Sequence, residues 1–210
     1  MKISVMTNPY DLMNETTIIN RLFEEGLEEL HLRKPAMDKR SYRDFILAIH
    51  PKYHRRIVIH AHFGLIREFE LKGIHVEEEM LTNRFFNWIL RTFMLGGKEV
   101  KKYVTVHSLS RVGKVANEAD EVLIGPIFRK VSQVTCNRMY NVEAVEKTVK
   151  KYHQKLAGIG SVCSQTIVAY LQFGFESVTT QTAIWKSSDP IASYIELRQM
   201  ASQSGMRAAA

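Results

Sequence analysis

The sequence predicts one α/β domain folded as a single (β/α)8 TIM barrel, and two observations lead to this prediction. First, the 210 residues contain no long Pro/Gly/Ser linker and no break in composition, which fits one large domain better than two small ones. Second, eight short apolar segments recur along the chain, with helix-like sequence between most of them. Strands that alternate with helices form parallel sheets, and eight such repeats suit closure into a barrel.

The predicted strands are short and mostly lack polar alternation, as strands do when both faces of a sheet are buried. In chain order they are Ile3–Met6, Leu30–Leu32, Ile57–Ile59, Gly73–Val76, Tyr103–Val106, Val122–Ile124, Leu156–Ile159 and Ser177–Thr180. A doubly wound open sheet is the alternative. It is disfavoured because the first strand leads into Thr7–Leu12, which has no Gly-rich dinucleotide-binding turn.

Helices are predicted where apolar residues recur at helical spacing behind a capping residue. The predicted capping or opening residues are, in chain order, Asn14, Asp38, Ser110, Ser161 and Asp189. The helix capped by Ser161 is expected to span Val162–Phe173, and another is expected to span Val142–Tyr152. The last predicted helix has Pro190 at its first position. Residues 1–201 are predicted to form the barrel domain, and residues 202–210 a flexible C-terminal tail.

The longest apolar stretch, "RFFNWILRTFML" over Arg84–Leu95, is predicted to be an amphipathic helix because Arg91 interrupts it. Its aromatic residues fit two interpretations, the face of a homodimer or ordinary core. No stretch is long enough to span a membrane, and the N-terminal apolar run breaks at Asn8-Pro9 before it reaches the length of a signal peptide. The two cysteines have no metal-ligand spacing, which predicts free thiols and a cytoplasmic location.

The formal net charge of +7 fits three interpretations: a solvated basic surface, attraction of anionic small molecules such as phosphates, or binding of nucleic acid. The lysines and arginines are scattered, and no aromatic-basic recognition motif is present. Nucleic acid is therefore disfavoured. Phosphorylated small molecules are the expected partners.

In a (β/α)8 barrel the functional site lies at the carboxyl ends of the strands, so the residues there are the candidates. The Gly158–Ser161 turn follows the seventh strand, where barrels commonly bind phosphate. Its glycines allow close approach of the backbone, and it is expected to open a helix. Arg33 ends the second strand, and its guanidinium suits an anion; pairing with an acid is the alternative.

Five of the eight histidines fall at or beside three neighbouring predicted strand ends: His60, His62, His75 and His107, with His31 just before the Arg33 turn. Together with Glu77 or Glu79 such residues have the chemistry to bind a metal ion. Hydrogen-bonded packing is the alternative for each histidine. Glu77 and Glu79 are also candidate ligands for Mg²⁺ on a phosphorylated substrate, and a solvated surface is the alternative for them.

The ordered strand ends resemble those of the thiamine phosphate synthase family, which includes the related thiazole tautomerases. The most specific match is "EVLIGPIF", which is similar to the family's D-Y-[IV]-x-x-G-P-[IV]-[FY]. The other matching segments are "ELHLRKP", "GIHVEEE", "VTVHS", "AGIGSV" and "FESVTTQTAIWKSSDP". The resemblance covers nearly the whole chain, with the segments in the family's order.

The resemblance implies a TIM barrel that joins a hydroxymethylpyrimidine pyrophosphate to a thiazole phosphate and releases pyrophosphate. In this family Mg²⁺ and basic residues stabilise the departing pyrophosphate, so catalysis is mainly electrostatic. The expected catalytic residues are Arg33, which matches the family's pyrophosphate-binding arginine, together with Thr105 and His107. The expected substrate-binding residues are His60, His75, Pro126, Phe128, Gly158, Gly160, Ser161, Thr180 and Thr182.

Several family positions are substituted in this chain. The two aspartates that bind Mg²⁺ align with Ala61 and Met80, and one family lysine aligns with Pro35, beside Lys34. A second family lysine aligns with Gln133. Three functions therefore remain open: a synthase with an altered Mg²⁺ site, a tautomerase-type isomerase, and a binder of phosphorylated ligands that has lost catalysis.

Overall fold

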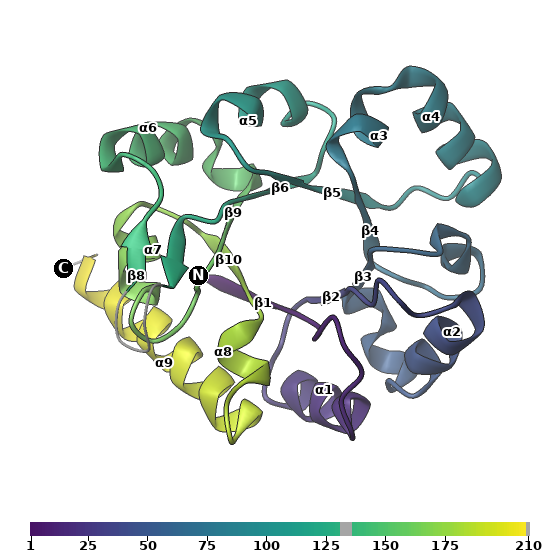
Figure 1. The fold of residues 1–210 in the computed structure, drawn as a ribbon, viewed down its shortest axis with the longest axis horizontal. Coiled ribbons are helices and arrows are strands. Elements are labelled where there is room, and N and C mark those ends of the chain that lie inside the picture. Colours follow the sequence, from purple (N-terminus) through teal and green to yellow (C-terminus); the bar gives the residue numbers. More distant parts are fainter. Residues whose placement is uncertain (131–135, 209–210) are drawn as a thin grey trace.

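The computed structural model describes residues 1–130 and 136–208 and confirms the closed parallel barrel (Figure 1). Its strands are β1 (Lys2–Met6), β2 (Leu30–Leu32), β3 (Ile57–Ile59), β4 (Gly73–Val76), β5 (Lys101–Val106), β6 (Glu121–Ile124), β9 (Leu156–Ile159) and β10 (Ser177–Thr180). They pair in the order β1-β10-β9-β6-β5-β4-β3-β2. All eight predicted strands are present, and only β1, β5 and β6 begin one or two residues earlier than predicted.

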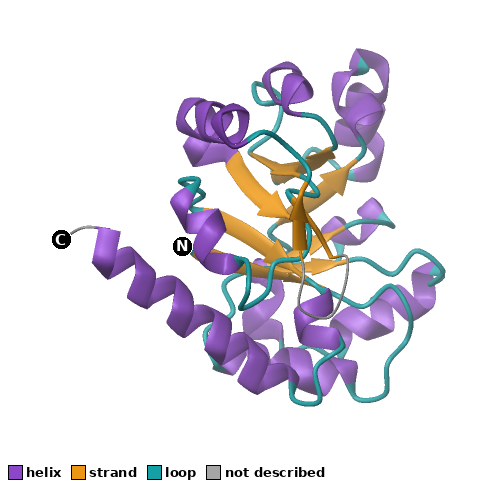
Figure 2. Ribbon diagram, turned by 60° about the vertical axis from the view of Figure 1, so that its left-hand side comes forward, coloured by secondary structure: helices purple, strands orange, loops and turns teal. Residues whose placement is uncertain are grey.

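The helices lie outside the strands (Figures 1 and 2). They are α1 (Glu15–Glu24), α2 (Lys39–Leu47), α3 (Glu78–Thr82), α4 (Arg84–Ile89), α5 (Leu109–Val115), α6 (Val142–Tyr152), α7 (Ile167–Gln172), α8 (Thr182–Trp185) and α9 (Pro190–Ala208). Single 3-10 turns span Pro51–Arg56, Phe63–Arg67 and His153–Lys155, and a π-helical turn spans Leu90–Met94. An antiparallel hairpin of β7 (Phe128–Lys130) and β8 (Cys136–Arg138) follows β6.

Two predicted helix caps are confirmed. The Asp38 carboxylate accepts hydrogen bonds from the N–H groups of Arg40 and Ser41, and Asp189 caps α9 in the same way. The Asn14 cap is wrong, because Asn14 has a left-handed backbone and its side chain makes no capping bond, although α1 does follow it. Ser110 lies inside α5, which begins at Leu109.

The helix after β9 begins later than predicted. α7 starts at Ile167, so Ser161 does not cap it, and the residues between form a turn. The Thr166 hydroxyl donates a hydrogen bond to the Ser161 carbonyl, 2.5 Å away, and accepts one from the Cys163 N–H. This local bonding replaces the first turn of the predicted helix.

The long helix α9 packs against α1, α7 and α8 and closes the outer layer on one side of the barrel (Figure 2). Its buried face carries Tyr194, Leu197 and Ala201. The helix continues to Ala208, and the flexibility of residues 202–210 stays a prediction. Among the described residues, no helix is long and apolar enough to cross a membrane.

The aromatic segment Arg84–Leu95 forms α4 and the π-helical turn, not one regular helix. Leu90 and Leu95 are buried, but Phe85 is 68% exposed and packs with Trp88, which is 54% exposed. Phe93 packs edge-to-face against Trp88 and is also exposed. The segment therefore contributes both core and an exposed aromatic surface, and the homodimer stays a prediction.

Candidate active site at the barrel mouth

Two adjoining cavities open at the carboxyl ends of the strands. The first, of about 520 Å³, lies over β9 and β10 and is called the β9–β10 cavity. The second, of about 670 Å³, lies over β2 to β5 and is called the histidine cavity. Met6 and Ile159 line both cavities and form the boundary between them. The mouth can thus hold two ligands side by side.

The turn after β9 forms one wall of the β9–β10 cavity. Gly160 has a φ of +100°, and a Cβ on it would lie 2.5 Å from the Pro126 Cβ. Ser161 has a φ of 48°, an uncommon conformation for a residue with a side chain. Gly158 lies outside the cavity lining, because it packs against the Tyr170 ring. Two of the three predicted phosphate-turn residues therefore reach the cavity.

Hydrogen bonds from three side chains fix this turn. The Thr180 hydroxyl donates to the Val162 carbonyl, and Thr166 bonds Ser161 as described above. The Tyr170 hydroxyl lies 2.9 Å from the Ile159 carbonyl and 2.6 Å from that of Gly160. Thr180 is buried, so its observed role is to hold the turn from behind and not to line the cavity.

Replacing Gly160 by Ala should distort this turn. The new methyl group meets Pro126, and an alanine at a φ of +100° is strained. We expect the variant to unfold at a lower denaturant concentration, with a loss of more than about 1 kcal/mol. Ala183→Gly in α8 is the control for a change of side-chain size alone, because Ala183 also lines this cavity but has no positive φ. Its loss of unfolding free energy should not exceed about 1 kcal/mol. An equal loss in the two variants would contradict the strain argument.

Two groups in the β9–β10 cavity were not predicted from the sequence. The Thr179 hydroxyl is buried and has no hydrogen-bond partner among the described residues. Lys186 lies just past α8 and lines the cavity beside the predicted Thr182. The alternation Ser177-x-Thr179 along β10 could have indicated Thr179, because alternate strand residues share one face.

The histidine cavity contains Arg33, which ends β2 and is exposed. Its backbone is fixed to the end of β1: the Arg33 N–H donates to the Thr7 hydroxyl over 2.8 Å, and that hydroxyl lies 3.0 Å from the Arg33 carbonyl. Lys34 is buried and forms an ion pair with Glu15, while its Nζ also donates to the Tyr10 carbonyl. Lys34 therefore anchors the loop after β1 although it also lines the cavity, whereas the Arg33 side chain forms no ion pair among the described residues and is available to a ligand.

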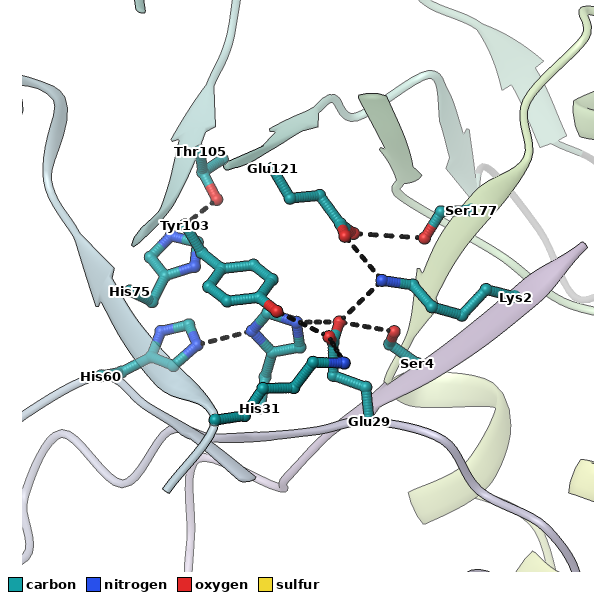
Figure 3. Close-up of polar contacts among 11 residues, drawn as sticks. Lys2, Ser4, Glu29, His31, His60, His75, Tyr103, Thr105, Glu121 and Ser177 are labelled. Atoms are coloured by element: carbon teal, nitrogen blue, oxygen red, sulfur yellow. Dashed lines mark hydrogen bonds and ion pairs between the residues drawn. The ribbon is translucent and has the colours of Figure 1, made fainter. Parts of the chain in front are cut away.

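Three histidines from neighbouring strands lie together (Figure 3): His60 and His75 line the floor of this cavity, and the fully buried His31 lies directly against them. His31 Nδ1 lies 3.1 Å from His60 Nε2, and the His60 and His75 rings stack with centroids 4.1 Å apart. His75 Nε2 lies 3.1 Å from the Thr105 hydroxyl. Burial, with the nearby charges of His31 and Arg33, lowers the pKa of His75 to about 3. Burial and the same neighbours hold the pKa of His60 well below its usual value, so both rings are neutral at neutral pH.

A buried carboxylate lies beneath the histidines. Glu29 is fully buried and contacts five donors: Lys2, Lys72, Ser4, His31 and Tyr103. Burial alone would raise the pKa of Glu29, but the His31 hydrogen bond and the two lysines outweigh it and hold the pKa far below its usual range. Figure 3 shows this group in the barrel interior, with the Glu29 carboxylate beside the His31 ring.

The other predicted residues lie around the mouth. His107 lines the histidine cavity, and its Nδ1 lies 2.7 Å from the Gly125 carbonyl, which orients the ring. The cis Gly125-Pro126 bond ends β6, but Pro126 lines neither cavity. Phe128 is buried against Tyr170 and Phe173. Its ring therefore packs against α7 and lines neither cavity, and its role in substrate binding stays a prediction. Gln133 lies outside the described residues.

The residues at the mouth do not fit a resident Mg²⁺ ion. Mg²⁺ requires oxygen ligands in octahedral geometry. Glu78 forms an ion pair with Arg111, while Glu77 and Glu79 are exposed on the cavity rim. In the described part of the chain, the side chains close enough to share an ion are the three histidines, which offer nitrogen. The roles of Glu77 and Glu79 as Mg²⁺ ligands stay predictions that no observed contact supports.

The fold and the mouth define a single-domain TIM-barrel protein with its candidate site at the carboxyl ends of the strands. A profile described as thiamine monophosphate synthase matches residues 3–184, which is most of the chain. The chain therefore belongs to the thiamine monophosphate synthase family.

Individual relatives agree with this assignment. A thiamine-phosphate synthase of Dictyoglomus thermophilum is 21% identical over 177 residues, which cover 82% of this chain and 76% of the relative. The crystal structure of thiamine phosphate pyrophosphorylase from Bacteroides thetaiotaomicron superposes with a TM-score of 0.78 at 27% identity, covering 96% of this chain and 98% of the other. The Pyrococcus furiosus pyrophosphorylase gives the same TM-score at 16% identity, with coverage of 97% and 96%, and supports the fold alone.

Proposed function

We propose that this protein couples a hydroxymethylpyrimidine pyrophosphate to a thiazole phosphate, forming thiamine phosphate and pyrophosphate. The pair of adjoining cavities at the barrel mouth carries this proposal. One cavity offers a fixed turn, hydroxyl groups and Lys186, which suit a monophosphate. The other offers Arg33, which suits the pyrophosphate. Met6 and Ile159, shared by both cavities, mark where the two reacting groups would meet.

In this mechanism the chain acts by binding and orientation. Arg33 forks onto the pyrophosphate oxygens and stabilises the charge that grows as the C–O bond to the pyrimidine breaks. The pyrimidine then carries positive charge, and the thiazole nitrogen forms the new bond to it. His60 and His75 face this space as neutral rings, so they do not repel the developing cation. Neither histidine has to act as an acid, because the step transfers no proton to the leaving pyrophosphate.

The direct test is a coupling assay with tag-free protein and both substrates, with thiamine phosphate and pyrophosphate measured by chromatography. Formation of both products in equal amounts supports the proposal. Thermal stabilisation by thiazole phosphate without product would instead identify a non-catalytic binder. If the protein neither turns over nor binds either substrate, the proposal is wrong.

Lys186 supplies the test of the β9–β10 cavity. We expect Lys186→Ala to raise the KM for thiazole phosphate about tenfold, because one charge-assisted hydrogen bond is lost. The effect on kcat should be smaller, since the phosphate does not react. Lys150→Ala on α6 removes an exposed lysine outside the cavity lining and is the control. An unchanged KM in Lys186→Ala would exclude this lysine from phosphate binding.

A further inference from the structure

Three ring nitrogens converge at the floor of the histidine cavity. His31 comes from β2, His75 from β4, and His60 directly follows β3. One nitrogen of each lies within 4.8 Å of the others. Two imidazole ligands of a tetrahedral zinc site, with Zn–N bonds of about 2.0–2.1 Å, are roughly 3.3 Å apart. The distance of 3.1 Å between His31 Nδ1 and His60 Nε2 is close to that spacing.

Two of the three rings have a polar side chain at one nitrogen, which makes the other nitrogen available to a metal ion. His31 Nε2 lies 3.2 Å from Glu29, so a neutral, metal-binding His31 would carry its one proton on Nε2 towards the carboxylate and leave the Nδ1 lone pair for the metal. His75 Nε2 faces the Thr105 hydroxyl, and His75 Nδ1 is buried without a hydrogen-bond partner among the described residues. Metal-binding histidines typically have such a carboxylate or other acceptor on their second nitrogen. An orphaned buried nitrogen is costly unless something occupies it.

We propose that His31, His60 and His75 bind one divalent transition-metal ion of the zinc or cobalt class at the floor of the histidine cavity. Imidazole nitrogen suits these ions, whereas Mg²⁺ prefers oxygen. The site goes beyond the proposed coupling reaction, and metal binding tests it without either substrate. His60 and His75 line the cavity that contains Arg33, so a phosphate oxygen or water in that cavity would be placed to complete the coordination.

One rearrangement accompanies binding. The His60 and His75 rings are stacked at 10°, which sets their lone pairs in parallel planes. To share an ion, one ring must turn about its Cβ–Cγ bond. His60 Nε2 already has a suitable spacing from His31 Nδ1, and His75 Nδ1 has no hydrogen-bond partner among the described residues, so His75 is the ring that turns.

The test is metal binding by tag-free protein from which metal has been removed with a chelator. Wild type should bind one equivalent of Zn²⁺ in competition with a chromogenic chelator, and Zn²⁺ should raise its melting temperature. The Co²⁺ form should show the visible spectrum of nitrogen ligation. His60→Gln and His75→Gln should each lower the Zn²⁺ affinity by more than about a hundredfold, exceeding the usual effect of an outer-shell change. Excess Mg²⁺ should not displace Zn²⁺.

His153→Gln is the matched control, since this histidine is exposed on the outer side of the barrel. It should bind Zn²⁺ as wild type does. Melting curves of the metal-free variants show whether each one folds. If His75→Gln is unfolded, the Zn²⁺ affinity of His60→Gln, whose substitution lies at the open mouth, tests the proposal. The proposal is overturned if wild type binds no stoichiometric Zn²⁺. It is equally overturned if folded His60→Gln binds with unchanged affinity.

Discussion

Glu29→Ala should destabilise the protein by about 3–5 kcal/mol, the range seen when one partner of a buried ion pair is removed. Glu29 is fully buried and accepts contacts from Lys2 at 3.1 Å and Lys72 at 2.6 Å. Without it, both lysines lose an anion, although Lys2 keeps Glu121. The cost arises mainly from cations and hydrogen-bond donors left in the barrel interior without their acceptor.

Denaturant unfolding followed by far-UV circular dichroism measures this effect. Glu29→Gln keeps the size and one acceptor oxygen, so its loss should be smaller than that of Glu29→Ala. The matched control is Glu70→Ala, which removes an exposed carboxylate paired with Arg55. That change should cost less than about 1 kcal/mol, because a surface ion pair is well solvated. A similar cost for Glu29→Ala and Glu70→Ala would show that the interior network adds nothing to stability.

The strands were predictable because each is a short apolar run between polar segments. The inner face of the barrel was harder to predict. When both faces of a sheet are buried, polarity does not mark which residues point inward. Ser4 and His31 lie inside strands that were predicted from the apolar residues beside them, and Glu29 directly precedes β2. The polar contacts inside this barrel could therefore be identified only once the order and register of the closed strands were known.

Local sequence also left competing choices that only tertiary contacts decide. Ser161 and Thr166 are both residues that cap helices, and the hydroxyl of Thr166 bonds the carbonyl of Ser161, which delays α7. Lys34 and Arg33 are adjacent cations at the same strand end. Both line the cavity, but Glu15 pairs with Lys34 across the loop after β1, which leaves the charge of Arg33 available to a ligand. Neither outcome follows from spacing along the chain.

Arg33→Ala should lower kcat/KM for the coupling reaction by about a hundredfold to a thousandfold, as removal of one preorganised donor does at other sites. Arg33 is exposed in the histidine cavity, and its side chain forms no ion pair within the described residues. Its removal should therefore leave the melting temperature of the free protein nearly unchanged. Charge on the leaving pyrophosphate grows as the C–O bond breaks, so the loss should fall on kcat as well as on KM.

Two further variants separate charge from geometry. Arg33→Lys retains the charge but not the planar fork, so it should recover only part of the lost activity. Arg40→Ala removes an exposed arginine from α2, outside both cavity linings, and should behave as wild type. Binding gives an independent measurement: pyrophosphate should raise the melting temperature of wild type and of Arg40→Ala, but not of Arg33→Ala. Equal stabilisation of all three proteins would exclude Arg33 from the pyrophosphate site, and the anion would then have to bind in the β9–β10 cavity beside Lys186.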